Sequence, residues 1–195
     1  MKKLLLCCLL ACMTQAVLAQ RSAVDQRYLA GAVPLVNGFV QFDSTYTVAG
    51  KSRGELYSAL KQYVQSALVN GPEHLPQARI TEADSLNGVI AASIEEYLYF
   101  KRTAWSTHRV RFYYQLVYQI TDGQFSVSMR RLHYMYDPEV SPVGQEADYR
   151  AEQWITDKEA LSSNGTKLTR VGGKFRRFTI DRKDEIFAAS MQAVK

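Results

Sequence analysis

The chain has 195 residues and a formal net charge of +5 at pH 7, from 24 Lys and Arg against 19 Asp and Glu. This length is enough for one hydrophobic core. This small excess of positive charge is not evidence for binding of nucleic acid. We expect no nucleic-acid partner. The three cysteines, Cys7, Cys8 and Cys12, all lie near the N-terminus. The rest of the chain therefore can form no disulfide, bind no metal through cysteine and use no thiol as a nucleophile.

Residues 1–19 have the three parts of a signal peptide. Lys2 and Lys3 give a positive start, a short apolar run extends to Ala11, and Val17-Leu18-Ala19 has the spacing that a signal peptidase recognises. The apolar run is shorter than the ~20 residues that span a bilayer. We therefore expect cleavage after Ala19 and export of the mature protein, which would be periplasmic or secreted.

A second processing route competes with the first. Leu9-Leu10-Ala11-Cys12 resembles a lipobox, in which Cys12 would be lipidated and would anchor the protein to a membrane. Leu10 and Met13 depart from the usual pattern around such a cysteine, so cleavage after Ala19 is favoured. Contact with a membrane is expected only if Cys12 is lipidated.

The mature chain opens with a linker, a strand and a helix. Residues 20–35 show little periodicity and predict an N-terminal linker. Alternating apolar residues predict a half-buried strand over 36–48. Ser52 and Glu55 match a capping box, which begins an amphipathic helix that ends before Asn70-Gly71-Pro72.

A run of strands and two further helices follow. The predicted strands cover residues 78–86, 89–102, 107–121 and 124–136. Asn87-Gly88 predicts a type I′ turn with two positive φ angles, and Asp122-Gly123 predicts a second two-residue turn. A loop is expected over 137–149, a short helix over 157–162, and a last helix capped by Asp181.

The order β-α-β-β-β-β-α predicts an α+β domain over residues 36–195, with a mainly antiparallel sheet. Two amphipathic helices can cover only one face of such a sheet. The other face should be open unless a partner covers it.

Several segments also carry a resemblance to a known family. They are Phe39-Val40-Gln41-Phe42, Lys51-Ser52, Glu55-Leu56-Tyr57, the tyrosine-rich strands, residues 154–159 and residues 179–187. With them the chain resembles, over most of residues 36–194, a bacterial family of secreted domains of unknown function with a TATA-binding-protein-like (TBP-like) fold. The resemblance implies that fold and an envelope setting, and it supplies no activity and no functional residues. The TATA-binding protein binds DNA through its open sheet face, but a fold does not carry a function.

The Asp122-Gly123 turn fixes which side chains share a face. With two turn residues, Ile120 faces Phe125 and Leu116 faces Met129 on the side covered by helices. The alternate positions form the open face. The pairs predicted there include Gln115 with Arg130, Tyr113 with Leu132, Arg111 with Tyr134 and Arg109 with Tyr136.

This open face is predicted to be rich in Arg and Tyr. Its candidate binding residues are Arg109, Arg111, Tyr113, Arg130, Tyr134 and Tyr136. Both residue types are enriched in protein interfaces, because they combine contact area with hydrogen bonding. Ordinary cross-strand pairing explains the same residues. Arg131 and His133 fall on the covered face in this register, so they either lie at its rim or indicate a bulge.

The sequence contains no recognisable set of catalytic residues. His74, His108 and His133 are scattered without metal-ligand spacing, and no phosphate loop, nucleophile elbow or dinucleotide motif occurs. The side chains of Glu95 and Glu96 should point to opposite faces of a strand, so they cannot act as a pair. We therefore expect no enzyme activity, no cofactor and no metal.

Three functions remain as hypotheses. The leading one is a binding or assembly module of the envelope, which would use the open Arg and Tyr face to bind a protein partner or itself. The second is a carrier of a small amphipathic or lipid-like ligand, held between the sheet and a helix. The third, and least supported, is a hydrolase.

Overall fold

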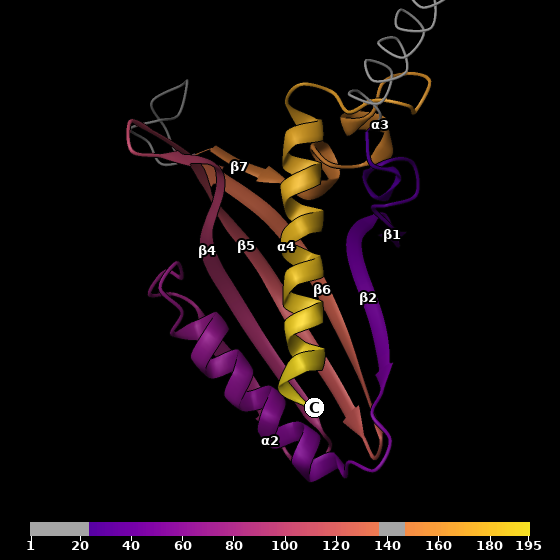
Figure 1. Ribbon diagram of the computed structural model, residues 1–195, viewed down its shortest axis with the longest axis vertical. Coiled ribbons are helices and arrows are strands. Elements are labelled where there is room, and N and C mark those ends of the chain that lie inside the picture. The colour runs from indigo at the N-terminus through magenta and orange to yellow at the C-terminus, as the bar shows by residue number, and fades with distance from the viewer. Residues whose placement is uncertain (1–23, 137–146) are drawn as a thin grey trace, which may run out of the picture.

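The computed structural model describes residues 24–136 and 147–195. The predicted leader and Cys12 lie outside these residues. The fold is α+β, as expected, with a seven-stranded antiparallel sheet. The two long helices, α2 and α4, lie on the same side of this sheet (Figure 1). Within residues 24–136 and 147–195, no helix is both long and apolar enough to cross a bilayer.

The described residues form helices and strands along most of their length. In chain order they are the 3-10 helix η1 (Gln26–Tyr28), β1 (Leu35–Val36), β2 (Phe39–Thr47), α2 (Arg53–Tyr63), the π-helical η2 (Val64–Val69), β3 (Arg79–Asp84), β4 (Val89–Thr103), β5 (Ser106–Thr121), β6 (Gln124–Tyr136), β7 (Ala147–Arg150), the 3-10 helix η3 (Ala151–Gln153), α3 (Asp157–Ala160) and α4 (Gly172–Ala193). The strands run across the sheet in the order β1-β2-β6-β5-β4-β3, and β7 pairs with β6.

The core lies between the sheet and the two helices. Helix α2 begins with the predicted capping box, in which Ser52 and Glu55 bond each other's backbone, and its buried face carries Leu56 and Leu60. Helix α4 is fastened to the sheet by two buried hydrogen bonds. The hydroxyl of Tyr118 on β5 lies 2.8 Å from that of Ser190, and the hydroxyl of Tyr134 on β6 lies 2.7 Å from that of Thr179.

A bulge at Arg131 shifts the register of β5 and β6. The predicted pairs hold from Thr121 with Gln124 to Gln115 with Arg130. Arg131 then adopts a left-handed conformation with φ +56°, and the next pair joins Tyr113 to His133. The pairs predicted beyond this point are therefore wrong by one residue. Arg131 and His133 mark a bulge, which was one of the two explanations left open by the sequence.

The bulge lies where β6 changes its neighbour. From Gln124 to Arg130, β6 pairs with β2, and from His133 to Tyr136 it pairs with β7. The extra residue separates the two pairings. Strand β7 begins inside the segment predicted as a loop and ends one residue beyond it.

The N-terminal segment is packed onto the domain, so its prediction as a linker is wrong for residues 24–35. Tyr28 and Val33 are both buried. Arg176 on α4, which has no exposed surface, donates hydrogen bonds to the backbone oxygens of Tyr28 and Leu29. Apolar periodicity could not reveal this segment, because its contacts are made by single residues and by backbone carbonyls.

One predicted strand and one predicted turn have a different geometry. The strand expected over 36–48 is split at Asn37-Gly38, where both φ angles are positive and β1 turns back onto β2. At the β3–β4 turn only Gly88 has a positive φ. The side chain of Asp84 accepts backbone hydrogen bonds from Leu86 and Asn87, which makes a longer loop than the predicted type I′ turn.

Helix α4 begins at Gly172, nine residues before the predicted cap at Asp181. Gly172 and Gly173 are the first two residues of this helix. A Cβ on Gly172 would come within 2.5 Å of the Trp154 carbonyl oxygen, and one on Gly173 within 2.5 Å of the Leu168 side chain. The glycines are therefore required by close packing, because any side chain there would collide.

Candidate functional site

The sheet face opposite the helices is the first candidate site. Within the described part of the chain no helix packs on it. Its aromatic and charged members are only half-buried, and they come from three neighbouring strands. They are Tyr97 and Tyr99 of β4, Arg109, Arg111 and Tyr113 of β5, and Arg130 and His133 of β6. We call these seven residues the open-face cluster.

Four of the six candidate residues lie in this cluster, and two do not. Tyr134 is fully buried on the helix side, and its ring stacks on Phe112 at 5.3 Å. Tyr136 also lies on the helix side, with its ring 6.3 Å from that of Phe175. Placing these two tyrosines on the open face was wrong, because the bulge at Arg131 reverses the side of every later residue of β6.

His133 occupies the position on the open face that was predicted for Tyr134. Its ring stacks on Tyr113, with centroids 4.5 Å apart and planes 9° from parallel. The sequence contains a signal that could have predicted this position of His133. His133 is a polar residue that the unbulged register would have placed in the apolar core.

The cluster is held in place by contacts among its own members and with Gln115 of β5. The Arg109 guanidinium lies 3.6 Å from the centre of the Tyr97 ring, and its Nη1 donates a hydrogen bond to the Tyr99 hydroxyl at 3.3 Å. Arg130 donates to the side-chain oxygen of Gln115 at 3.0 Å. These contacts reduce the conformational freedom that a partner would have to remove on binding.

Tyr113 has a fixed direction on this face. Its hydroxyl donates a 2.7 Å hydrogen bond to the Glu95 carboxylate, and Glu95 is itself buried. Burial and this hydrogen bond raise the pKa of Tyr113 to about 12, against the opposing effect of Arg111. The phenol therefore stays neutral and keeps donating at any physiological pH.

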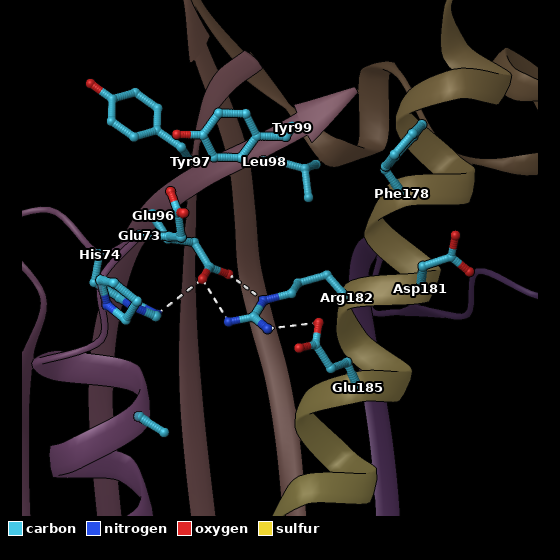
Figure 2. A pocket seen from close by; sticks show the side chains of 12 residues that line it. Glu73, His74, Glu96, Tyr97, Leu98, Tyr99, Phe178, Asp181, Arg182 and Glu185 are labelled. Carbon is cyan, nitrogen blue, oxygen red and sulfur yellow. Dashed lines mark hydrogen bonds and ion pairs between the residues drawn. The ribbon is translucent and has the colours of Figure 1, made fainter. Parts of the chain in front are cut away.

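A groove at the edge of β4 is the second candidate site (Figure 2). It has a volume of about 480 Å³ and lies between β4, α4 and the segment around His74. Its polar and aromatic lining consists of Glu73, His74, Glu96, Tyr97, Tyr99, Phe178, Asp181, Arg182 and Glu185. Tyr97 and Tyr99 belong both to this groove and to the open-face cluster.

Glu96 is the centre of the groove. Arg182 binds its carboxylate through two nitrogens, Nε at 2.9 Å and Nη2 at 2.7 Å. The Tyr114 hydroxyl donates at 2.8 Å, and His74 Nε2 lies 2.9 Å from the second oxygen. Burial alone would raise the pKa of Glu96, but His74 and Arg182 outweigh it and lower the pKa to about 2.

This arrangement stabilises the packing of β4, α4 and the segment around His74, and it provides few groups that could act in catalysis. Glu96 stays ionised at neutral pH, so it has no proton to donate. Its two oxygens are occupied by three neighbouring side chains. Arg182 is shared with Glu185, whose carboxylate lies 2.8 Å away. No Ser or Cys nucleophile is among the lining residues, and no group of three potential metal ligands occurs within the described ranges.

Glu95 and Glu96 point to opposite faces of β4, as predicted, but the cluster around Glu96 was not predicted. Glu95 points to the open face and Glu96 to the helix side. His74 reaches Glu96 because its segment pairs with β4. Leu75 donates its N–H to the Glu95 carbonyl at 2.8 Å, and Tyr97 donates to Glu73 at 3.2 Å. No local pattern predicts a bridge between segments so far apart in the chain.

The fold and its one-sided covering define an α+β protein of the TBP-like class. It has a TM-score of 0.64 and 17% identity with the crystal structure of a TBP-like protein from Parabacteroides distasonis, over 83% of this chain and 96% of that one. At this identity the likeness concerns the fold alone.

The family follows from a closer likeness. The crystal structure of a DUF4468 family protein from Bacteroides ovatus is 32% identical, with a TM-score of 0.78, over 89% of this chain and 96% of that one. Residues 42–135 also match the domain of unknown function (DUF4468) with TBP-like fold. The chain belongs to the DUF4468 family. The search of curated proteins gives no significant match.

Proposed function

We propose that this protein is a non-enzymatic binding or assembly module of the bacterial envelope, which binds a protein partner or a second copy of itself through the open-face cluster. The observation that supports the proposal is the one-sided sheet. Helices α2 and α4 occupy one face, while the other carries half-exposed Tyr, Arg and His side chains. Export by the predicted leader would bring this face into the envelope.

The chemistry of the cluster suits recognition of a protein. Tyr and Arg recur at the energetic centres of protein interfaces, because each combines a flat contact area with directional hydrogen bonds. The stack of Arg109 on Tyr97 and of Tyr113 on His133 already orders these side chains. A partner would therefore meet a rigid surface, which reduces the entropy lost on binding.

The alternative of a ligand carrier depends on the groove around Glu96. The space between sheet and helices is filled by packed side chains such as Phe112, Tyr118 and Phe175, so a ligand buried there would have to displace them. Native mass spectrometry of the purified protein tests this alternative. A bound small molecule that is lost with Phe178→Asp would support it, and a mass equal to the bare chain would oppose it.

Replacement of Tyr99 and Arg109 tests the main proposal. A photo-crosslinking amino acid at position 117, on the same face of β5, reports contacts in cells, and sedimentation of the purified protein reports self-association. We expect one discrete adduct or a concentration-dependent dimer. We expect Tyr99→Ser with Arg109→Ser to abolish it.

Arg177→Ser is the matched control, because Arg177 is an exposed cation on α4, on the opposite side of the sheet. This variant should keep the adduct. The proposal fails if position 117 gives no adduct and the protein stays monomeric at every concentration. It also fails if the double variant binds as well as the wild type.

A further inference from the structure

Trp105 is a large apolar side chain that the described residues leave almost wholly exposed. It lies at the turn between β4 and β5, where Thr103 pairs with Ser106, and it is 96% exposed. The chain has one other tryptophan, Trp154, whose ring packs 4.6 Å from Phe175. Leaving a whole indole in water gives up the largest hydrophobic gain of any side chain.

The surroundings of Trp105 are basic. From Tyr97 to Thr121 the sequence contains no Asp or Glu, and Lys101 and Arg102 are exposed beside the turn. Lys174, at the start of α4, adds a third cation, with its Nζ 2.8 Å from Nδ1 of His108 on β5. Among the described residues, Glu73 contacts this group, with its carboxylate 2.5 Å from Arg102.

The turn lies at one end of the molecule. Strands β4 and β5 form a long hairpin whose tip extends as far as the N-terminus of α4 (Figure 1). Val171, just before that helix, is also 53% exposed, and Arg170 beside it is exposed and cationic. The described chain begins near the same end, beside the N-terminal half of α4.

We infer that this end of the protein docks on a lipid bilayer with anionic headgroups, with Trp105 inserted at the interface. Tryptophan prefers the headgroup layer, because its ring is apolar while its N–H can still bond to water or lipid. Lys101, Arg102 and Lys174 would face the phosphates. Each basic residue near such a surface contributes about 1 kcal/mol, or roughly fivefold in affinity.

The shape of the site favours a membrane over a protein. A stable protein interface buries about 800 Å² on each partner, whereas a hairpin tip offers one large apolar side chain among cations. A bilayer needs no complementary pocket, since a single indole can enter it from a convex tip. This inference is independent of the open-face proposal, because Trp105 is not part of that cluster.

Fluorescence of Trp105 with lipid vesicles tests the inference. The protein is produced with its own leader, so that any processing at Cys12 is common to all variants. Trp154→Phe leaves Trp105 as the sole tryptophan. With vesicles that contain phosphatidylglycerol, we expect its emission to shift to the blue and its quenching by acrylamide to fall. With phosphatidylcholine alone, both changes should be small.

Two variants separate insertion from simple charge attraction. Trp105→Ser should reduce co-sedimentation with the phosphatidylglycerol vesicles at least tenfold. Lys101→Glu with Lys174→Glu should weaken it by more than about 25-fold, because two attractive charges become repulsive. Lys61→Glu is the control, because Lys61 is an exposed cation of α2, a helix that lies away from the hairpin tip in Figure 1. This loss of positive charge elsewhere on the surface should have no such effect.

Either of two results would overturn the inference. One is an unchanged emission of Trp105 at saturating phosphatidylglycerol. The other is binding that does not differ between the wild type and Trp105→Ser. If Trp154→Phe fails to fold, the difference between the wild-type and Trp105→Phe spectra gives the signal of Trp105 directly.

Discussion

Arg176 shows how one buried cation can hold several segments together. It has no exposed surface, and it donates hydrogen bonds to the backbone oxygens of Tyr28, Leu29 and Ile155 at 2.6, 2.5 and 2.8 Å. Its fourth partner is the Asp157 carboxylate at 2.7 Å. The guanidinium thereby links α4 to the N-terminal segment and to the start of α3, in a way that only a planar group with five donors can.

We expect Arg176→Met to lower the free energy of unfolding by about 3 kcal/mol or more, because three buried carbonyls and a carboxylate lose their donor. Arg177→Met is the matched control, since Arg177 is adjacent and exposed, and its effect should stay within ~0.5 kcal/mol. Urea unfolding at pH 7 measures both. Equal stabilities of the two variants would show that Arg176 is not a structural anchor.

Glu96 is expected to make stability depend on pH. Its pKa is lowered to about 2 in the folded protein, against about 4.3 in an unfolded chain. A lowered pKa stabilises the fold above the unfolded value, and this contribution is lost as the pH falls from about 4.3 through about 2. The difference amounts to roughly 3 kcal/mol.

The measurement is the free energy of unfolding between pH 7 and pH 2. Glu96→Gln should be destabilised by about 3 kcal/mol at pH 7, because Arg182 loses its buried partner, and its stability should fall less steeply in acid than that of the wild type. Glu82→Gln, at an exposed position on β3, should follow the wild type. A variant of Glu96 with the wild-type acid profile would contradict this account.

At the scale of elements, the bulge in β6 decides which side chains face the core. Before Arg131, β6 follows the register that the two-residue turn dictates, and after it the side chains change sides relative to that register. The bulge therefore buries Tyr134 under α4 and presents His133 on the open face. It also allows β6 to exchange β2 for β7 as a neighbour.

The left-handed conformation of Arg131 predicts an unusual pattern of substitutions. Arg131→Val should lower stability by about 1–2 kcal/mol, because a β-branched side chain is strained at positive φ. Arg131→Gly should be neutral or should gain up to ~1 kcal/mol. Arg130→Val, in the ordinary part of the same strand, should have little effect beyond the loss of its bond to Gln115. Thermal unfolding compares the three, and the expectation fails if Gly and Val at position 131 behave alike.

On the scale of the whole molecule, the sheet is covered from one side by two helices and closed at one end by the N-terminal segment. The described chain before β1 is part of the fold, since Tyr28 and Val33 are buried and Arg27 pairs with Asp181 on α4 at 2.7 Å. The domain therefore starts before position 36, where the sequence placed its boundary.

We expect a chain that begins at position 36 to be less stable by about 5 kcal/mol or more than one that begins at position 24. Burial of Tyr28 and of Val33 contributes about 1.5–3 kcal/mol each, and Arg176 would lose two acceptors. Such a loss is comparable with the whole stability of a typical domain. Thermal unfolding of the two chains tests the boundary. Equal melting temperatures would show that the domain begins at position 36.

Much of the fold could be predicted because its signals are local. Strands β4, β5 and β6 match the predicted ranges within a residue at each end, since alternation and turn residues define a strand from its own sequence. The candidate site was only partly predictable. Arg109, Arg111 and Tyr113 lie on β5, where buried and half-buried residues alternate without a break, and Arg130 precedes the bulge. Tyr134 and Tyr136 follow the bulge and change sides.

What the sequence by itself determined was the order of the longer strands and helices, the α+β class and the one-sided covering, because each depends on periodicity, capping and turns within a few neighbouring residues. Only the tertiary structure decided that Arg176 is buried, that His74 and Arg182 meet at Glu96, and that Tyr134 lies under α4. These facts depend on contacts between segments far apart in the chain. Whether a polar residue is buried is set by the partners that folding brings to it.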